Sequence, residues 1–525
     1  MPALERKWWT LITVCTAIFM LLLDITVVNV ALPDIQRSLN ASFSSLQWVI
    51  DAYALTLAAF LLTAGVVGDM YGRREVFAIG LAVFTLASLL CGLSTTSLML
   101  DLARAVQGVG GAIMFATSLA LIAQAFHGKE RGTAFGVFGA VTGGAVAVGP
   151  LIGGAITSSI GWRWIFFVNV PIGVVAVFLA LSKIDESRDP NTRRIDWLGF
   201  VTFSASLFCL VFALVRGNDE GWASPMIVGL LVSAAVLMGI FIAGELLQRD
   251  PMLDLGLFKR PAVSGVSLAA FSLSASIFSL FLYLTLYIQD DLGYSPLQAG
   301  IRFLPITLMA FVVAPFAGRL TVRISARWLL GLGLALVGVG MVLMAHIASD
   351  SGWTELLPGL LVAGAGIGMV NPVLASSAVA VVPPERSGMA SGMNSTFRQV
   401  GIATGIAALG AIFQSQIRVK TFSTLAQSAV GEQVAKHGGS RLGPALASGA
   451  VRSVAAHIPP TPRQVLLHAY KVAFAASLNE LLFIGAAVAL IGALGSVLLV
   501  HQRDFVPSLG PTTQPAARQP EAALS

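Results

Sequence analysis

Charged side chains are scarce in this sequence. Of its 525 residues only 11% are Asp, Glu, Lys or Arg, 56% are hydrophobic, and the mean hydropathy is +0.83. A soluble domain carries about 25% charged residues, and a chain this long and apolar has more hydrophobic side chains than one water-soluble core encloses. The composition therefore excludes a soluble globular protein and predicts an all-helical protein that crosses a membrane many times.

Cysteine and clustered metal-ligating residues are also scarce. The three cysteines, Cys15, Cys91 and Cys209, lie inside apolar runs, so they indicate neither a disulfide framework nor a metal site. The one Gly-Lys pair, at Gly128, lacks the glycine spacing of a phosphate-binding loop. No cluster of His, Cys or carboxylate residues is expected at a common depth in the membrane. We therefore expect no enzyme, no metal and no other cofactor, and transport would draw on an ion gradient.

Long apolar runs, by contrast, recur along the whole chain. Runs of roughly 18 residues or more are long enough to span a bilayer as a helix. The sequence predicts spans at 9–32, 47–67, 76–95, 98–125, 133–156, 164–182, 197–216, 225–244, 263–288, 297–318, 328–347, 356–380, 388–413 and 472–500.

The basic residues lie mostly in short connections between these runs. The net charge of +6 is therefore dispersed in loops that face lipid and cytoplasm, and it does not indicate nucleic-acid binding. With the N-terminus inside, the short outer connections hold only Arg37, Arg163 and Arg216. This asymmetry predicts a multi-pass protein of the cell membrane with both termini in the cytoplasm. The long connection 414–471 is assigned outside although it is basic, and the tail is expected to be disordered.

An internal repeat of about 255 residues relates the two halves of the chain. The segment from Ala64 resembles the segment from Ala317, and Glu130-Arg131 aligns with Glu385-Arg386. Parallel repeats with a site at their interface are typical of transporters that work by alternating access. We predict an N-terminal six-helix bundle over 1–182, a linker with two additional spans over 183–262, a C-terminal six-helix bundle over 263–501 with the external loop 414–471, and a cytoplasmic tail over 502–525.

An acidic residue interrupts the first apolar run. Asp24 lies eight residues before Leu32, roughly 12 Å from the outer end of its helix, which is too deep for so short a side chain to reach water. Because an acid facing lipid is costly, we expect Asp24 to face the bundle interior. A carboxylate balanced between burial and a nearby arginine can take up and release a proton, and can attract a cationic substrate. The alternative is a structural Asp bonded to Thr26 or to the backbone.

Other polar and aromatic residues inside spans are further candidates. Arg104 is a candidate partner for proton coupling, although it could instead cap a carbonyl network. Asp51 is a second coupling candidate, with a solvated acid at a helix end as the alternative. Arg398 and Glu480 could instead form structural pairs, and the aromatic residues of the ninth span could instead face the core or the lipid. The candidates for substrate contact or coupling are Asn29, Tyr53, Tyr283, Tyr287, Arg398 and Glu480.

The connection after the second span reads GVVGDMYGRREVF from Gly65. It resembles the loop signature of the major facilitator superfamily, which implies a role in closing the cytoplasmic side. Gly72 permits a tight turn, Asp69 is placed to meet a helix N-terminus or a cation, and Arg73 and Arg74 anchor the inner face. The superfamily usually has a basic residue where this chain has Met70. The alternative role is topology anchoring.

Two further motifs follow in the order that the same superfamily shows. LDLARAVQG around Arg104 resembles its second motif, whose arginine is linked to proton transfer. GPLIGG in the fifth span resembles its antiporter signature, although Ala145 stands where a glycine is usual; the matching residues are Gly149, Pro150, Gly153 and Gly154. With LDITVVNVALP and GWRWIFFVNVPIG, the chain resembles the fourteen-span drug:proton antiporters of the QacA/EmrB type over about residues 10–500.

This resemblance implies the major facilitator fold, with two six-helix bundles and two extra helices, and proton-coupled multidrug efflux. The expected substrates are lipophilic small molecules, cationic ones included, and the expected partners are protons and the lipid bilayer, with the monomer as the functional unit. A dedicated exporter of an antibiotic, siderophore or lipid precursor is the alternative. A non-transporting membrane sensor fits least, because no connection except 414–471 is long enough for a signalling domain.

Overall fold

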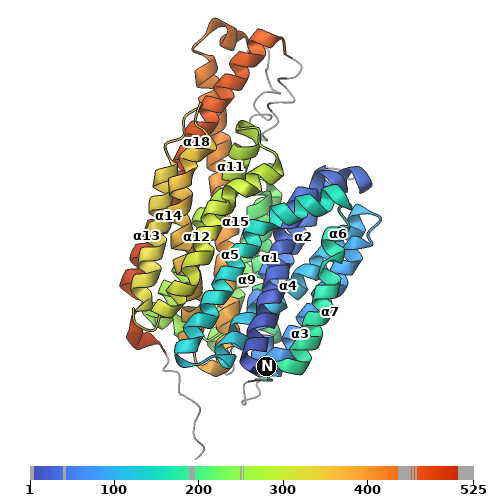
Figure 1. The fold of residues 1–525 in the computed structure, drawn as a ribbon, viewed down its shortest axis with the longest axis vertical. Helices are drawn as coiled ribbons and strands as arrows, with labels where there is room; N and C mark the ends of the chain where they lie inside the picture. The colour runs from blue at the N-terminus through green and yellow to red at the C-terminus, as the bar shows by residue number, and fades with distance from the viewer. Residues whose placement is uncertain are drawn as a thin grey trace, which may run out of the picture.

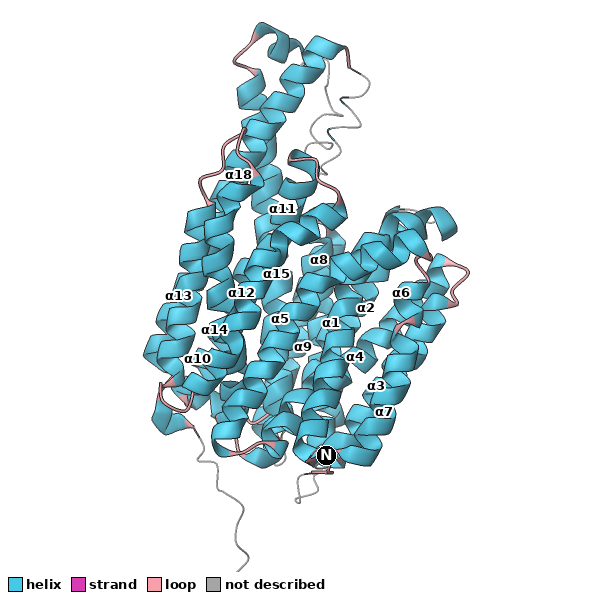
Figure 2. Cartoon of the chain, in the orientation of Figure 1, coloured by secondary structure: helices cyan, strands magenta, loops and turns pink. Residues whose placement is uncertain are grey.

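The computed structural model describes residues 5–39, 43–188, 196–248, 251, 253–434, 451, 455 and 458–505. These residues are almost entirely helical, and none of them lies in a β-strand (Figure 2). Thirteen of their helices are long and apolar enough to cross a membrane. A further helix, α5 (Gly128–Ser159), stands where the fifth span is predicted. The prediction of an all-helical polytopic membrane protein is confirmed.

The helices up to Lys183 form the N-terminal bundle. In it α1 packs on α5 and α7, while α4 packs on α2 and α3. The sixth predicted span is broken at Val168, so that Asn169 is the first residue of α7. The helices are α1 (Arg6–Leu39), α2 (Phe43–Tyr71), α3 (Arg73–Gly92), α4 (Ser97–Ala125), α5, α6 (Trp164–Phe167) and α7 (Asn169–Lys183).

The helices from Pro261 onward form the C-terminal bundle. Its first span is not one regular helix, because the π-helical segments η2 (Ser274–Phe278) and η3 (Tyr287–Asp291) alternate with α-helix. Each π segment changes the face that the following residues present. The other helices are α10 (Pro261–Leu273), α11 (Ser279–Leu286), α12 (Pro296–Leu320), α13 (Ala326–Met344), α14 (Leu357–Ala380), α15 (Ser387–Leu425) and α18 (Pro460–Leu499).

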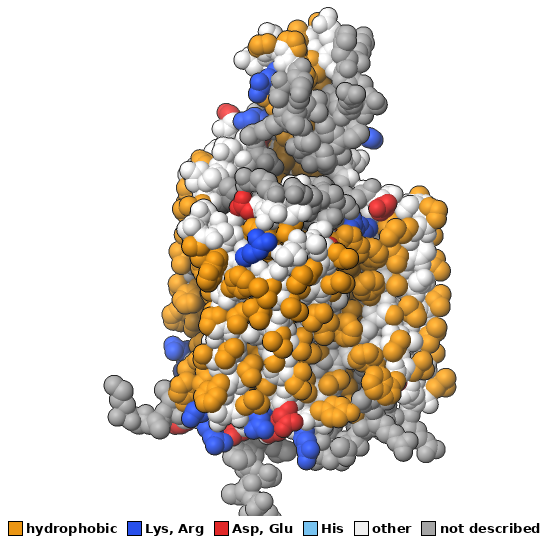
Figure 3. Space-filling view, turned by 90° about the vertical axis from the view of Figure 1, so that its right-hand side faces the viewer, with side chains coloured by type: hydrophobic (Ala, Val, Ile, Leu, Met, Phe, Trp, Pro, Cys, Tyr) orange, Lys and Arg blue, Asp and Glu red, His pale blue; other side chains and the backbone are white. Residues whose placement is uncertain are grey.

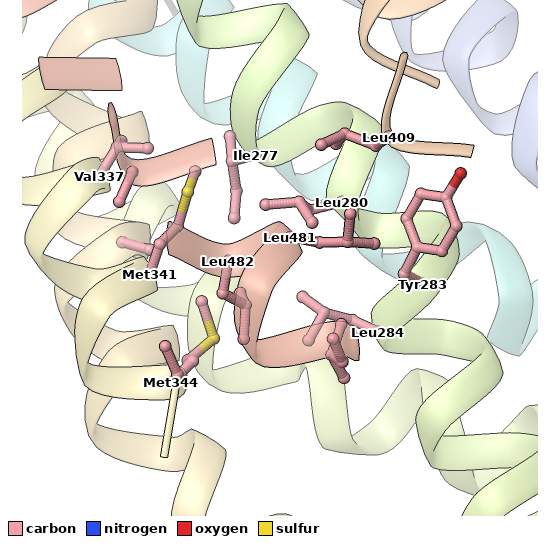
Figure 4. Packing of buried hydrophobic residues seen from close by; sticks show 14 of the residues in the cluster. Ile277, Leu280, Tyr283, Leu284, Val337, Met341, Met344, Leu409, Leu481 and Leu482 are labelled. Atoms are coloured by element: carbon pink, nitrogen blue, oxygen red, sulfur yellow. The ribbon is translucent and has the colours of Figure 1, made fainter. Parts of the chain in front are cut away.

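A large apolar core holds the C-terminal bundle together (Figure 4). Leu280 and Leu284 of α11 meet Leu481 of α18, and Met341 and Met344 of α13 close the other side. All five side chains are buried. Such close packing makes the C-terminal bundle resist internal rearrangement.

The two extra helices lie on the outside of the bundles. α8 (Trp197–Glu220) packs on α9 (Pro225–Leu247) and contacts both α2 and α15. Of the most apolar stretch of α9, only 17% of the residues are buried inside the protein. Both helices follow the N-terminal bundle in sequence, and in space α8 covers the junction of α2 and α15 from the outside.

Both ends of the described chain lie at one end of the molecule, which we call the lower face. It carries the start of α1 at Arg6 and the end of α18 at Leu499 (Figure 1). On the side seen in Figure 3, a broad belt of hydrophobic side chains covers the middle of the molecule, and charged side chains gather at its lower edge and above it. This is the surface that a bilayer requires.

The segment 414–471, expected to be a loop, is largely helical at both of its ends. α15 continues to Leu425 and α18 begins at Pro460, and together they rise well above the upper face (Figure 1). The length of an apolar run predicts only the part of a helix that lies within the bilayer. A helix continues past that point if its residues still pair with a neighbouring helix, as Lys420 does with Glu480.

The two bundles meet along α2–α15 and α5–α12. Near the lower face these helices touch backbone to backbone, because glycines face each other. A Cβ added at Gly65 would lie 2.1 Å from the carbonyl oxygen of Gly388, and one at Gly132 would lie 2.2 Å from that of Gly318. No side chain fits at either point, so the path between the bundles is closed toward the lower face.

Candidate functional site

Asp24 lies at the centre of a buried polar network in the N-terminal bundle. One carboxylate oxygen, Oδ2, pairs with Nη1 of Arg104. The other, Oδ1, accepts hydrogen bonds from Nε2 of Gln107 at 3.1 Å and from Nδ2 of Asn169 at 3.2 Å. The predicted interior position of Asp24 is thus what the structure shows, and helices α1, α4 and α7 all contribute to the network.

Arg104 connects this carboxylate to α2. Its Nε donates to the carbonyl oxygen of Val49 at 3.0 Å, and its Nη1 also donates to Oε1 of Gln107 at 2.8 Å. The guanidinium carbon lies 4.2 Å from the ring centroid of Tyr53. The arginine is 1% exposed, so it depends on these contacts in place of water.

A cavity of about 390 Å³ lies beside this network, between the two bundles. Arg104 and Tyr53 line it, whereas Asp24 stands behind them. The N-terminal bundle adds apolar residues of α1 and α2, and the C-terminal bundle adds Phe278, Phe281 and the hydrophobic side chains of α12 and α15. A change in the charge of Asp24 therefore reaches the cavity through Arg104 and Tyr53.

A second arginine, Arg398 of α15, lines the cavity from the C-terminal bundle. Its Nη1 donates to Oδ1 of Asn371 at 3.2 Å, and its guanidinium carbon lies 5.7 Å from the ring centroid of Phe278. Of the described residues, none offers Arg398 a carboxylate.

The structure separates Asp51 and Glu480 from this network. Asp51 forms an ion pair with Arg216 of α8 at 3.7 Å, so it ties α2 to an extra helix. Glu480 pairs with Lys420 at 2.7 Å across α15 and α18, and its side chain is 42% exposed. Neither residue lines the cavity.

Of the three tyrosines predicted to contact substrate, one lies at the cavity and two lie in the core of the C-terminal bundle. Tyr53 lines the cavity, but Tyr283 and Tyr287 belong to the core of the C-terminal bundle. The Tyr283 hydroxyl donates to the carbonyl of Ile406 at 3.3 Å, and the Tyr287 hydroxyl donates to that of Ser351 at 3.1 Å. The side chain of Asn29 lies outside the described residues.

The loop between α2 and α3 binds the start of α15. The Asp69 carboxylate accepts hydrogen bonds from the backbone N–H groups of Gly388 and Met389, both at 2.8 Å, and from Nε of Arg73 at 2.8 Å. The same arginine donates from Nη2 to the carbonyl oxygens of Pro384 at 2.6 Å and Glu385 at 3.0 Å. One buried ion pair thus joins the two bundles at the lower face.

The chain after α7 fastens the other side of this loop. The Glu186 carboxylate accepts hydrogen bonds from the backbone N–H groups of Arg74 at 3.0 Å and Glu75 at 3.2 Å, at the N-terminus of α3. Gly72 has φ 118°, a conformation that favours glycine, and a Cβ there would lie 2.8 Å from the same carboxylate.

The glycines of the fifth span let α5 approach α1. A Cβ at Gly149 would lie 1.7 Å from Oγ1 of Thr26, and one at Gly153 would lie 3.0 Å from Cγ1 of Val27. Gly154 accepts a hydrogen bond from Ser158 at 2.7 Å within the helix. The side chain of Pro150 lies outside the described residues.

Two members of the Asp24 network carry no charge, and sequence reasoning assigned them no role. Asn169 and Gln107 are both buried amides that donate to the carboxylate. The signal that could have found Asn169 is its place just before Pro171, where the sixth span breaks. In the described part of the chain no group of three or more His, Cys, Asp and Glu residues is placed to hold a metal ion.

Comparisons with known proteins agree with this architecture. Residues 14–406 match the family described as Major Facilitator Superfamily. The chain is 35% identical over 429 residues to "Multidrug resistance protein Stp" of Mycobacterium tuberculosis, covering 82% of this chain and 80% of that one. It is 38% identical over 412 residues to "Puromycin resistance protein pur8" of Streptomyces alboniger, covering 78% and 82%.

A third relative and one solved structure extend the comparison. "Tetracenomycin C resistance and export protein" of Streptomyces glaucescens is 32% identical over 413 residues, covering 78% of this chain and 77% of that one. The crystal structure of the human transporter MFSD10 (TETRAN) superposes with a TM-score of 0.58, covering 93% of this chain and 100% of that one. Because the sequence identity to MFSD10 is only 14%, this similarity concerns the fold alone.

Proposed function

The chain belongs to the Major Facilitator Superfamily, and on that premise we propose that it is a proton-driven antiporter that exports lipophilic compounds. The observation that carries the proposal is the pair of Asp24 and Arg104, buried beside the cavity between the bundles. A buried ion pair that loses one charge is destabilised by about 3–5 kcal/mol. Protonation of Asp24 therefore changes which arrangement of α1, α2 and α4 is stable, which is what coupling requires.

The geometry supports a simple sequence of events. With Asp24 ionised, Arg104 is held on the carboxylate and on Val49, which fixes α1 and α4 against α2. A proton arriving at Asp24 neutralises it and frees Arg104 to find other acceptors around the cavity. Release of that proton on the other side of the membrane restores the pair. The proton gradient thus drives the bundles through one cycle while the cavity carries its substrate the opposite way.

We place the lower face in the cytoplasm, together with both termini. Basic side chains of the short connections, such as Arg73 and Arg74, lie at this face, as the inner side of a membrane protein requires. In this orientation the structure is closed toward the cytoplasm.

Cysteine labelling tests this orientation. In a chain without its native cysteines, a cysteine at Gly128 or Glu385 should react with a membrane-impermeant maleimide only from the cytoplasmic side. A cysteine at Ser423, exposed on the extension of α15 above the upper face, should react only from outside. Labelling of position 423 from the cytoplasm would refute the proposed topology.

The relatives support drug or antibiotic efflux as the class of activity. One is named for multidrug resistance, one for resistance to puromycin, and one for resistance to and export of tetracenomycin C, so the names cover both broad and single-compound activity. Growth-inhibition profiles of cells with and without the protein, across a wide panel of compounds, separate the two. Protection against many unrelated compounds indicates a multidrug pump, and protection against one chemical family indicates a dedicated exporter.

Everted membrane vesicles test the proton-driven mechanism itself. Vesicles that contain the protein should accumulate a compound from that panel when respiration acidifies their interior, and a protonophore should abolish the accumulation. Vesicles from cells without the protein provide the baseline. Accumulation that survives the protonophore and depends on ATP would contradict the proposal.

A further inference from the structure

The charges that line the central cavity all have one sign. Arg104 and Arg398 line it, and among the described residues no Asp or Glu does. The charge of Arg104 is offset by Asp24, which stands directly behind it. Arg398 has no such counter-charge, so the C-terminal side of the cavity is electropositive.

The surroundings of Arg398 also contain unused polar groups. Its one hydrogen bond within the described chain goes to Asn371, which leaves other N–H groups of the guanidinium unpaired. Ser395, one turn earlier on α15, lines the same cavity, and its buried hydroxyl has no partner among the described residues. A buried hydroxyl normally has a partner, so Ser395 together with Arg398 offers hydrogen-bond donors to an acceptor that the described residues do not supply.

Most of the remaining wall is apolar and partly aromatic, with a few uncharged polar side chains such as Gln399. Phe278 and Phe281 line the cavity on the same side as Arg398, and Phe281 in turn packs on Phe303, with ring centroids 5.5 Å apart. The π-helical segment that ends at Phe278 sets the face on which these two rings lie. Flat rings pack well on such side chains.

We propose that the cavity selects flat aromatic compounds that carry a carboxylate, with the carboxylate on Arg398 and Ser395 and the rings against Phe278 and Phe281. This inference rests on the proposed transport function and specifies its substrate class. It reverses the expectation of cationic substrates, because Asp24, the carboxylate behind the cavity wall, is already paired with Arg104. Carboxylate recognition by a guanidinium is directional as well as electrostatic.

Equilibrium dialysis of the purified full-length protein in detergent tests the proposal without any proton gradient. The probes are pyrene carboxylate, pyrene methanol and pyrene methylammonium at neutral pH, which share their rings and differ in charge. Protein-free micelles measure partitioning into detergent. We expect the carboxylate to bind about tenfold more tightly than the methanol, as one charge-assisted hydrogen bond gives, and the ammonium to bind least.

Variants of Arg398 assign the difference to that residue. Arg398→Gln should reduce binding of the carboxylate to the level of the methanol and leave the methanol unchanged. Arg302→Gln is the matched control, because Arg302 lies over Tyr294, outside the cavity, and its loss changes the net charge equally. Arg302→Gln should preserve the order of the three probes.

Two results would overturn the proposal: a wild-type protein that binds the ammonium as tightly as the carboxylate, or an Arg398→Gln variant that keeps the carboxylate preference. Should Arg398→Gln fail to fold, the wild-type order of affinities decides alone. Failure of proton-driven accumulation in vesicles, by contrast, bears on the transport mechanism and leaves this binding test intact.

Discussion

Replacement of Asp24 by Asn is expected to abolish proton-coupled transport while the protein still folds and inserts. The amide has nearly the shape of the carboxylate and still accepts hydrogen bonds from Gln107 and Asn169, but it cannot exchange a proton. Arg104 then keeps one arrangement in both halves of the cycle. Accumulation in everted vesicles should fall to the level of vesicles without the protein.

Proton release measures the same step directly. Purified wild-type protein in weakly buffered detergent, with a pH-sensitive dye, should release protons when a transported compound binds, and Asp24→Asn should release fewer. Asp51→Asn is the matched control, since its carboxylate pairs with Arg216 and does not line the cavity. Full release and full transport by Asp24→Asn would make Asp24 structural and leave Asp51 or Glu480 to carry the proton.

The unpaired arginine in this variant requires its own control. Asp24→Asn leaves Arg104 buried without a counter-charge, a situation that costs about 3–5 kcal/mol in proteins. The double variant Asp24→Asn/Arg104→Gln contains neither charge. It should melt at a higher temperature than the single variant and remain inactive, which separates loss of coupling from loss of stability.

The charged members of the site could be predicted from the sequence because charge is costly inside a membrane. Asp24 and Arg104 lie in apolar runs 80 positions apart, and only a bundle interior makes both tolerable. Asn169 and Gln107 carry no such cost, and the only mark that the unaligned sequence gives either of them is the position of Asn169 just before Pro171. Their role follows from the break between α6 and α7 and from the packing of α4 on α1, which are tertiary facts.

The contacts that each candidate residue makes could not be predicted from the sequence, because they depend on tertiary packing. The sequence marks Asp51 as an acid near a helix end and places Arg216 in an outer connection, and only the packing of α8 on α2 brings the two together. The aromatic character of Tyr283 and Tyr287 predicts substrate contact, yet both side chains lie in the core, because α11 and its flanking π segments direct them there. Helix faces near π segments do not follow the regular period of an α-helix.

A bulky residue at Gly65 should hold the two bundles apart at the lower face and stop transport. Leucine there would place Cβ 2.1 Å from the carbonyl oxygen of Gly388, so the closed arrangement of α2 and α15 would be overpacked by about 1–3 kcal/mol. A change of that size moves an equilibrium between two states roughly 5- to 150-fold. The Asp69 carboxylate would also lose its hydrogen bonds to the start of α15.

Accessibility of the cavity reports this shift. A single cysteine at Thr142, which lines the cavity, should react slowly from the cytoplasmic side in the otherwise wild-type chain and quickly when Gly65→Leu is added. Gly229→Leu on α9 is the matched control, because a Cβ there meets nothing within 4 Å. Unchanged labelling together with normal export by Gly65→Leu would show that the loop after α2 anchors topology only. Fast labelling with lost export would show that closure at Gly65 and Asp69 is an obligatory step, since a cavity that stays open to the cytoplasm cannot deliver its contents outside.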